Sequence, residues 1–199
     1  MITIGLTGGI GMGKSTVAAL MRGFGLPVYN ADQAVHKLLS KNGKGVKPVA
    51  KLFPETLRGK AIDRKILGRI VFGHAGKLKK LEKILHVLVR QEEKKFLRTA
   101  YSKKMKAAVL EIPLLFETNS DKRCDCVICV TAPRAIQRKR VILRPGMTKE
   151  KLKAIQARQL ADKVKRKRAD YVIDTGGSRA QTKKRLRYIL NRILKANHA

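Results

Sequence analysis

The chain has 199 residues, a formal net charge of +32 at pH 7 and a hydrophobic content of 44%. This length suits one hydrophobic core with a small inserted subdomain, and the composition excludes a disordered or fibrous chain. The charge should attract polyanions. A general bias of the source organism toward lysine explains the charge at least as well as a dedicated role with nucleic acid.

No segment of the sequence has the character of a membrane span or a secretion signal. The first apolar run, residues 2–6, ends at a glycine-rich stretch that contains Lys14, and the run 107–116 carries Glu111 and Pro113. A membrane-spanning helix needs about 20 consecutive apolar residues, and a signal peptide has a longer apolar centre. We therefore expect a cytoplasmic protein that has no membrane partner.

A glycine-rich motif follows the first apolar run. Residues 8–15 read Gly-Gly-Ile-Gly-Met-Gly-Lys-Ser, between an expected strand at 2–6 and an amphipathic helix at 14–24. This is the context of a phosphate-binding loop, because glycines let successive backbone N–H groups point at phosphate oxygens. The Ser15 hydroxyl would bind Mg²⁺, and Thr16 would contact the α-phosphate. The motif predicts binding of a nucleoside triphosphate.

Five short apolar runs predict the strands of one sheet. They lie at residues 2–6, 27–29, 107–112, 126–131 and 171–173. The stretches between them have helical periodicity, which implies right-handed crossovers and a parallel sheet covered by helices on both faces. The expected fold is a doubly wound α/β fold, with the nucleotide at the carboxyl ends of the strands.

The second expected strand ends in Asn30, Ala31 and Asp32. In a doubly wound sheet this point lies opposite the phosphate loop, where a carboxylate can accept the proton of an attacking hydroxyl during phosphoryl transfer. Asn and Asp here are also common helix N-caps. We interpret Asp32 as a catalytic base and Asn30 as the cap, and capping by Asp32 remains the alternative.

A long insertion separates the second and third expected strands. It covers roughly residues 41–105 and contains helical patterns at 64–72 and 77–101. The apolar stripe of the second pattern is explained in part by ordinary core packing. A helical insertion of this size is also a common docking place for a second substrate.

A shorter segment, residues 138–167, follows the fourth expected strand and is dense in lysine and arginine. Arg140 and Arg144 are four residues apart, so a continuous helix would project both guanidinium groups from one face. Guanidinium groups can neutralise the charge that develops on a transferring phosphoryl group. For most of the other basic side chains in this segment, a solvated surface position is the better interpretation.

Glu111 and the three cysteines are the remaining candidates for metal binding. Glu111 closes the third expected strand, where it could hold Mg²⁺ through water, although a carboxylate that is merely tolerated at a strand end fits equally well. Cys124, Cys126 and Cys129 are close in sequence. On a strand, however, Cys129 would point to the opposite face from the other two. We therefore predict reduced, mostly buried thiols and no cysteine-bound metal.

Six segments, taken in chain order, carry a more specific pattern. They are residues 6–16, 31–32, 62–68, 84–86, 112–117 and 168–174. Many nucleotide-binding proteins share the first, whereas Pro-Leu-Leu-Phe-Glu at 113–117 and Ala-Asp-Tyr-Val-Ile-Asp at 169–174 are much more particular. In this order and spacing, and over nearly the whole chain, the segments resemble the dephospho-coenzyme A kinase family.

The resemblance implies transfer of the γ-phosphoryl group of ATP to the 3′-hydroxyl of dephospho-CoA, which gives coenzyme A and ADP with the help of Mg²⁺. It implies a P-loop kinase fold similar to that of adenylate kinase, in three parts. These are a nucleotide-binding core (1–40, 106–137 and 168–199), a helical CoA domain (41–105) and a closing lid (138–167). We expect a monomer or a weak homo-oligomer without a specific nucleic-acid partner.

The resemblance also assigns roles to single residues. Asp32 is the implied base, and Arg140 and Arg144 are implied lid arginines, the first with a catalytic role. ATP would be held by Gly9, Ile10, Gly11, Met12, Gly13, Lys14, Ser15, Thr16 and Arg144, with Lys14 also catalytic. The acceptor would be bound by Thr7, Asp32, Arg64, His86, Arg90, Leu115 and Glu117. Ser15 and Glu111 remain the expected contacts for Mg²⁺.

Four positions depart from the family pattern. Asn30 replaces an aspartate, Val87 a proline, Pro145 an acidic residue, and Thr175 an asparagine near the adenine. None of them removes an indispensable group, so the chemistry is expected to survive, with catalytic efficiency left open.

Two other functions fit part of the sequence. A different small-molecule kinase, or a nucleoside-monophosphate kinase, would share the phosphate loop but not the insertion that contains Arg64 and His86. A basic nucleic-acid-binding protein with a vestigial ATP site is supported by net charge alone, since tryptophan is absent and no nucleic-acid-binding motif is visible.

Overall fold

The structure of the protein, a computed structural model, describes residues 1–196. It divides into two compact units, which are described separately. The first unit comprises Met1–Tyr29 and the chain from Ala100 onward, and the second is Asn30–Thr99. Among the described helices, none combines the length and the apolar character needed to cross a bilayer.

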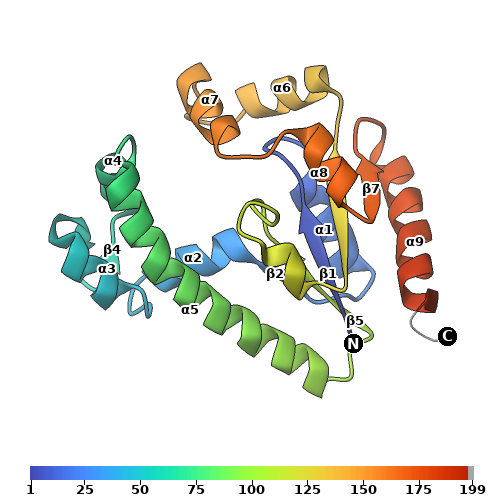
Figure 1. The fold of residues 1–199 in the computed structure, drawn as a ribbon, viewed down its shortest axis with the longest axis horizontal. Helices are drawn as coiled ribbons and strands as arrows, with labels where there is room; N and C mark the ends of the chain where they lie inside the picture. The colour runs from blue at the N-terminus through green and yellow to red at the C-terminus, as the bar shows by residue number, and fades with distance from the viewer. Residues whose placement is uncertain (197–199) are drawn as a thin grey trace. The chain divides into compact units, whose positions relative to one another are not determined.

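The first unit is built on a five-stranded parallel sheet with the strand order β2-β5-β1-β6-β7 (Figure 1). The strands are β1 (Ile2–Thr7), β2 (Val28–Asn30), β5 (Ala107–Glu111), β6 (Cys126–Thr131) and β7 (Tyr171–Asp174). In register, Leu6 of the central strand pairs with Glu111 on one side and Ile128 on the other. The sheet confirms the five predicted strands and the predicted α/β fold.

Helices follow the strands of this sheet and cover it. They are α1 (Lys14–Gly23), α6 (Arg134–Ile142), α7 (Lys149–Ala157), α8 (Asp162–Arg168) and α9 (Arg179–Ala196), and a short 3-10 helix spans Ser120–Arg123. Apolar side chains of α1 and α9 share one core with the strands; Val17, Leu186 and Ile128 are fully buried in it. The core therefore fixes α1, and with it the end of the phosphate loop.

The second unit is mainly helical and has its own core. Its elements are α2 (Ala31–Leu39), α3 (Val46–Leu52), a 3-10 turn (Pro54–Thr56), the hairpin β3 (Leu57–Arg58) and β4 (Ala61–Ile62), α4 (Arg64–Val71) and most of α5 (Ala75–Ser102). Leu39, Val49, Leu67 and Leu81 are buried together. The two predicted helices of the insertion are confirmed as α4 and α5. The hairpin was not predicted, because its strands are only two residues long.

Side-chain caps define two helix starts in the second unit. The Asn30 Oδ1 accepts a hydrogen bond from the Gln33 N–H (2.8 Å), which confirms Asn30 as the cap of α2. The Asp63 Oδ1 accepts from the N–H groups of Lys65 and Ile66 at the start of α4 (2.8 and 3.1 Å). The bond from Ile66 is the largest cause that lowers the pKa of Asp63.

Candidate active site

The phosphate loop has the backbone that its glycines predict. Gly11 and Gly13 have φ of 75° and 85°, in the left-handed region that disfavours side chains. A Cβ at Gly13 would lie 2.6 Å from the Thr175 Oγ1, and one at Gly11 would lie 2.5 Å from a methyl group of Val141. Glycine is therefore required at both positions by conformation and by space.

Helix α1 begins without a side-chain cap. Gly13 occupies the N-cap position and supplies no side-chain cap, and the first turn has no acidic residue. The first turn instead carries Lys14 and Ser15. A helix start without a side-chain cap, at the positive end of the helix dipole, favours an anion. The local structure is thus suited to phosphate groups.

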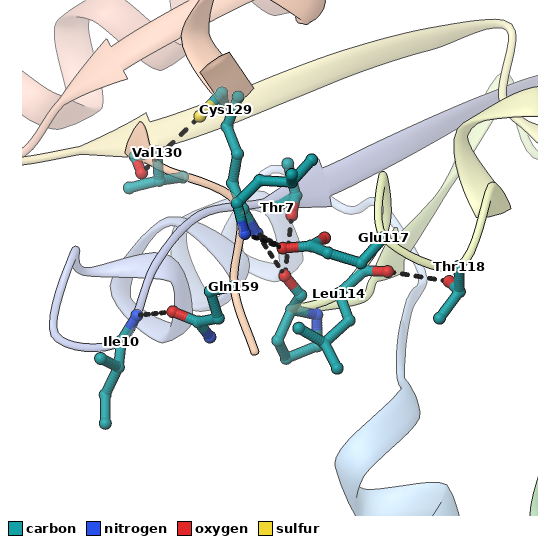
Figure 2. A network of polar contacts seen from close by, with 11 residues as sticks. Thr7, Ile10, Leu114, Glu117, Thr118, Cys129, Val130 and Gln159 are labelled. Atoms are coloured by element: carbon teal, nitrogen blue, oxygen red, sulfur yellow. Dashed lines mark hydrogen bonds and ion pairs between the residues drawn. The ribbon is translucent and has the colours of Figure 1, made fainter. Parts of the chain in front are cut away.

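Two glutamine side chains hold the Ile10 residue of the loop. The Gln159 Oε1 accepts a hydrogen bond from the Ile10 N–H (3.1 Å), as Figure 2 shows, and the Gln137 Nε2 donates to the Ile10 carbonyl oxygen (2.8 Å). Gln137 belongs to α6, and Gln159 lies between α7 and α8. Sequence analysis did not identify either glutamine, because neither belongs to a recognisable motif.

Thr175 connects three parts of the site. Its hydroxyl lies 2.8 Å from the Met12 carbonyl oxygen in the loop and 3.3 Å from the Thr131 carbonyl oxygen at the end of β6. Arg140 donates to the Thr175 hydroxyl (2.9 Å) and to its carbonyl oxygen (2.7 Å). The departure from asparagine at 175 therefore leaves a polar group that ties Arg140 to the loop region.

Arg140 and Arg144 do not share a helix face, contrary to our expectation. Helix α6 ends at Ile142 with Leu143 as its C-cap, so Arg144 lies beyond the helix and is exposed. Pro145 follows directly, and a residue before proline is disfavoured in the helical conformation. The prediction of one face was wrong for this local reason, which Pro145 and Gly146 signal in the sequence.

A cavity of about 1130 Å³ adjoins the loop within the first unit. Its lining includes Gly9 and Met12 of the loop, Thr131 at the end of β6, Asp162 of α8, Asp174 at the end of β7 and Gln181 of α9. Small-molecule sites commonly measure about 300–1,000 Å³, so this space can admit a nucleotide. The Thr131 hydroxyl donates to the Asp162 Oδ2 (2.9 Å).

A buried ion pair lies beside the cavity-forming segment. The Lys165 side chain is 0% exposed, and its Nζ lies 2.8 Å from the Glu117 Oε1 and donates to the Pro113 carbonyl oxygen at 2.9 Å. The same Glu117 oxygen accepts from the Leu160 N–H (2.8 Å), in the network drawn in Figure 2. Sequence analysis missed Lys165, because it lies in a run of basic residues that are otherwise exposed.

Three residues that the resemblance assigns to the acceptor lie in the first unit. Thr7 is buried at the end of β1, and its hydroxyl donates to the Pro113 carbonyl oxygen (3.2 Å). Leu115 is fully buried, with a methyl group 2.9 Å from the Cβ position of Gly5. Glu117 makes the ion pair with Lys165. The acceptor contacts of all three stay predictions.

The other acceptor candidates lie in the second unit. Asp32 is the second residue of α2, Arg64 opens α4, and His86 and Arg90 are four residues apart on α5. All four are exposed. Residues four apart on a helix are neighbours on its surface. His86 and Arg90 can therefore contact one ligand group.

The two Mg²⁺ candidates have positions that suit the ion. Ser15 is exposed in the first turn of α1, and Glu111 ends β5 in register with Leu6, just before the loop. Within residues 1–196, no three His, Cys, Asp or Glu form a metal-binding group. Mg²⁺ often takes only one or two protein ligands beside phosphates and water. A hydroxyl and one carboxylate therefore fit the ion when it arrives with a triphosphate.

The cysteines have the character of structural thiols. Burial raises the pKa of Cys126 to about 12, with the charges of Asp170 and Asp125 adding to the effect. Burial likewise raises the pKa of Cys129 to about 11, and Asp162 adds to it. Because both pKa values lie above the ordinary 9.0, the thiols contribute stability that is fully present below pH 9. This contribution is lost as the pH rises through about 11 for Cys129 and about 12 for Cys126.

Native Cys126 and Cys129 should therefore react with iodoacetamide at pH 8.5 at least about tenfold more slowly than in the denatured chain, since the thiolate is the nucleophile. Mass spectrometry of peptides after timed labelling measures both rates. The denatured protein is the control for intrinsic reactivity. Equal rates in the native and denatured protein would show that the thiols are accessible and ionise normally.

The chain is similar to known proteins over most of its length. A family model described as Dephospho-CoA kinase matches residues 2–181. The Dephospho-CoA kinase of Brucella melitensis is 49% identical over 178 residues, which cover 89% of this chain and 88% of the relative. The Dephospho-CoA kinase of Bartonella henselae is 43% identical over 195 residues, which cover 98% of this chain and 100% of the relative.

Solved structures agree with the sequence relatives. A Thermus thermophilus protein superposes with a TM-score of 0.81 at 36% identity, covering 96% of this chain and 97% of its own. The Dephospho-CoA kinase from Campylobacter jejuni gives 0.72 at 29% identity, covering 98% of each chain. A shikimate kinase from Acinetobacter baumannii, at 16% identity and 0.55 over 98% of this chain and 94% of its own, shares the fold alone. With the family model matched over residues 2–181 and the relatives 43% and 49% identical, the chain belongs to the dephospho-CoA kinase family.

Proposed function

We propose that the protein transfers the γ-phosphoryl group of ATP to the 3′-hydroxyl of dephospho-CoA, with Asp32 as general base. The 3′-oxygen forms a bond to the γ-phosphorus while the bond from that phosphorus to the β,γ-bridging oxygen breaks. The hydroxyl proton passes to the Asp32 carboxylate, and ADP leaves. The observation that carries the proposal is the glycine loop at the uncapped start of α1, in a chain that matches the family.

ATP is held by the first unit in this proposal. Backbone N–H groups of residues 9–13, apart from the Ile10 N–H that donates to Gln159, bind the phosphates together with the side chains of Lys14, Ser15 and Thr16. The rest of the nucleotide occupies the adjoining cavity. Arg140 and Arg144 neutralise the charge that develops on the transferring group. The proposed role of Arg140 is supported by its two hydrogen bonds to Thr175, which hold its guanidinium group near the phosphate loop.

Ser15 and Glu111 would hold Mg²⁺, the serine directly and the carboxylate through water. The ion, when bound, would neutralise charge on the β- and γ-phosphates and orient them. The protein's own contribution is to place the Glu111 carboxylate at the end of β5, in register with Leu6, and the Ser15 hydroxyl in the first turn of α1.

Dephospho-CoA is a polyanion, and the second unit offers cations to bind it. Arg64, His86 and Arg90 are exposed there and can contact phosphate groups. Thr7, Leu115 and Glu117 complete the proposed acceptor contacts. In domain terms we retain a core of 1–40, 106–137 and 168–199, an acceptor domain of 41–105 and a lid of 138–167. We propose a cytoplasmic monomer or weak homo-oligomer.

Purified protein should phosphorylate dephospho-CoA at least about tenfold faster than AMP, CMP or shikimate, judged by kcat/KM. The assay couples ADP release to a spectrophotometric readout, and mass spectrometry identifies a product heavier by one phosphoryl group. Protein without an acceptor measures background ATP hydrolysis. Equal rates with the four acceptors would contradict the proposed substrate.

A further inference from the structure

A continuous path of contacts leads from the buried ion pair to the phosphate loop. The Lys165 Nζ pairs with the Glu117 Oε1 at 2.8 Å. That oxygen accepts the Leu160 N–H at 2.8 Å, and the residue before Leu160 is Gln159, whose Oε1 accepts the Ile10 N–H at 3.1 Å. All five residues belong to the first unit. In the function proposed above Glu117 contacts the acceptor, whereas Lys165 and Gln159 have no assigned part.

We propose that Gln159 is a positioning residue for ATP, and that the Lys165–Glu117 pair fixes it in place through Leu160. In this arrangement Gln159 holds the phosphate loop in its binding conformation without being a catalytic residue. The inference rests on the proposed function for the identity of the nucleotide, since it concerns how the loop is prepared for a triphosphate.

The contacts around Ile10 indicate support of the loop and argue against competition with phosphate. Both polar backbone groups of Ile10 are engaged, its N–H by Gln159 and its carbonyl oxygen by Gln137. The neighbouring Gly11 packs against α6, since a Cβ there would lie 2.5 Å from the Val141 side chain and 3.0 Å from the Gln137 carbonyl oxygen. Ile10 and Gly11 therefore contact protein on this flank, and Gln137 and Gln159, which make these contacts, also line the cavity beside the loop. The start of α1, by contrast, has no side-chain cap.

Burial explains how the ion pair can fix a loop segment. Lys165 is 0% exposed and the Glu117 side chain is 14% exposed, so neither charge can exchange its partner for water without exposing both. The Glu117 oxygen that binds Lys165 is also the acceptor for the Leu160 N–H. The backbone N–H of Leu160, the residue after Gln159, is thus bonded to an oxygen of this buried charge pair.

The decisive variant is Gln159→Ala, whose side chain is only half-buried, so that folding is not at risk. ATP affinity is measured by isothermal titration calorimetry in the absence of an acceptor. We expect the Kd for ATP to rise about fivefold, the fold-change that loss of one hydrogen bond of average strength gives. In steady-state assays the KM for ATP should rise with it, while the KM for dephospho-CoA stays at the wild-type value.

Lys165→Met tests the longer path, with Lys167→Met as its matched control. Lys167 lies on the same helix, α8, but is exposed. We expect Lys165→Met to raise the Kd for ATP by a similar factor and Lys167→Met to leave it unchanged. The double variant Lys165→Met/Gln159→Ala should have a Kd for ATP no higher than the higher of the two single-variant values. The two effects should not add, because both changes interrupt the same chain of contacts. If Lys165→Met does not fold, Gln159→Ala decides alone.

An unchanged or lowered Kd for ATP in Gln159→Ala would overturn the proposal, and a lowered value would mean that the glutamine occupies a phosphate position. Additive effects in the double variant would also overturn the path through Gln159. Binding is measured without dephospho-CoA. If the wild-type protein failed to phosphorylate that acceptor, the proposed function would fall while this test stayed valid.

Discussion

Replacing Lys14 by alanine should reduce kcat by about 10³-fold or more, the largest effect that we expect from a single side chain. Lys14 is the first residue of α1, directly after Gly13, and its ammonium group supplies the charge that the surrounding backbone donors lack. A transferring phosphoryl group gains negative charge on its oxygens, so the loss is greater in the transition state than in the bound ATP. Initial rates at saturating ATP and dephospho-CoA measure it.

Lys195→Ala is the matched control for this experiment. Lys195 is exposed in the last turn of α9, and its removal changes the net charge by the same amount. The control should retain wild-type kcat. If Lys14→Ala kept more than about a tenth of the wild-type kcat, Lys14 would contribute mainly to binding of ATP and not to stabilisation of the transition state. The proposed catalytic role of Lys14 would then be wrong.

Asp32→Asn should lower kcat by about 10²-fold, the scale of general-base catalysis, with ATP affinity largely retained. The amide keeps the shape of the side chain but cannot take the proton of the attacking hydroxyl. Asp32 is exposed in the first turn of α2, and the cap of this helix is Asn30, whose Oδ1 accepts the Gln33 N–H at 2.8 Å. Rapid-quench measurement of the first turnover isolates the chemical step.

The neighbouring cap offers a variant with the opposite profile. Asn30→Ala should lower the free energy of unfolding by about 1 kcal/mol, measured by urea denaturation, because α2 loses its side-chain acceptor. Its kcat should change little. Asp32→Asn should show the reverse, with a large loss in kcat and a small change in stability. If Asp32→Asn kept the wild-type kcat, Asp32 would not be the general base, and its role would be limited to a favourable charge at the start of α2.

Elements that carry a periodic pattern or a fixed motif could be predicted from the sequence. The five strands, α1, α4 and α5 follow from apolar periodicity. The loop follows from its glycines, which adopt the left-handed backbone conformation that other residues disfavour. The hairpin β3–β4 could not be found in this way, because two residues per strand show no alternation. The end of α6 was not predicted, although Pro145 indicates it. The four-residue spacing of Arg140 and Arg144 was interpreted as one continuous helix, and the proline that follows Arg144 was not taken into account.

The support of the site was beyond sequence analysis for a different reason. Lys165 has the same local sequence character as Lys163 and Lys167, which are exposed. Only the tertiary approach of α8 to the turn after β5 makes it a buried partner of Glu117. In the same way, Gln137 on α6 and Gln159 between α7 and α8 acquire a role because the fold brings both side chains to Ile10. Such roles depend on long-range contacts that no local pattern encodes.

The absence of a side-chain cap on α1 affects how stable the folded protein is without a nucleotide. The N-cap residues of α2, α4 and α7 are Asn30, Asp63 and Thr148, whose side-chain oxygens accept backbone N–H groups. Helix α1, like α3, α6 and α8, has no side-chain cap. The phosphates of a bound triphosphate would take the place of such an acceptor, so binding of the nucleotide would stabilise the start of α1. By mass action the folded state then becomes more resistant to heat and to proteases as the cellular ATP level rises.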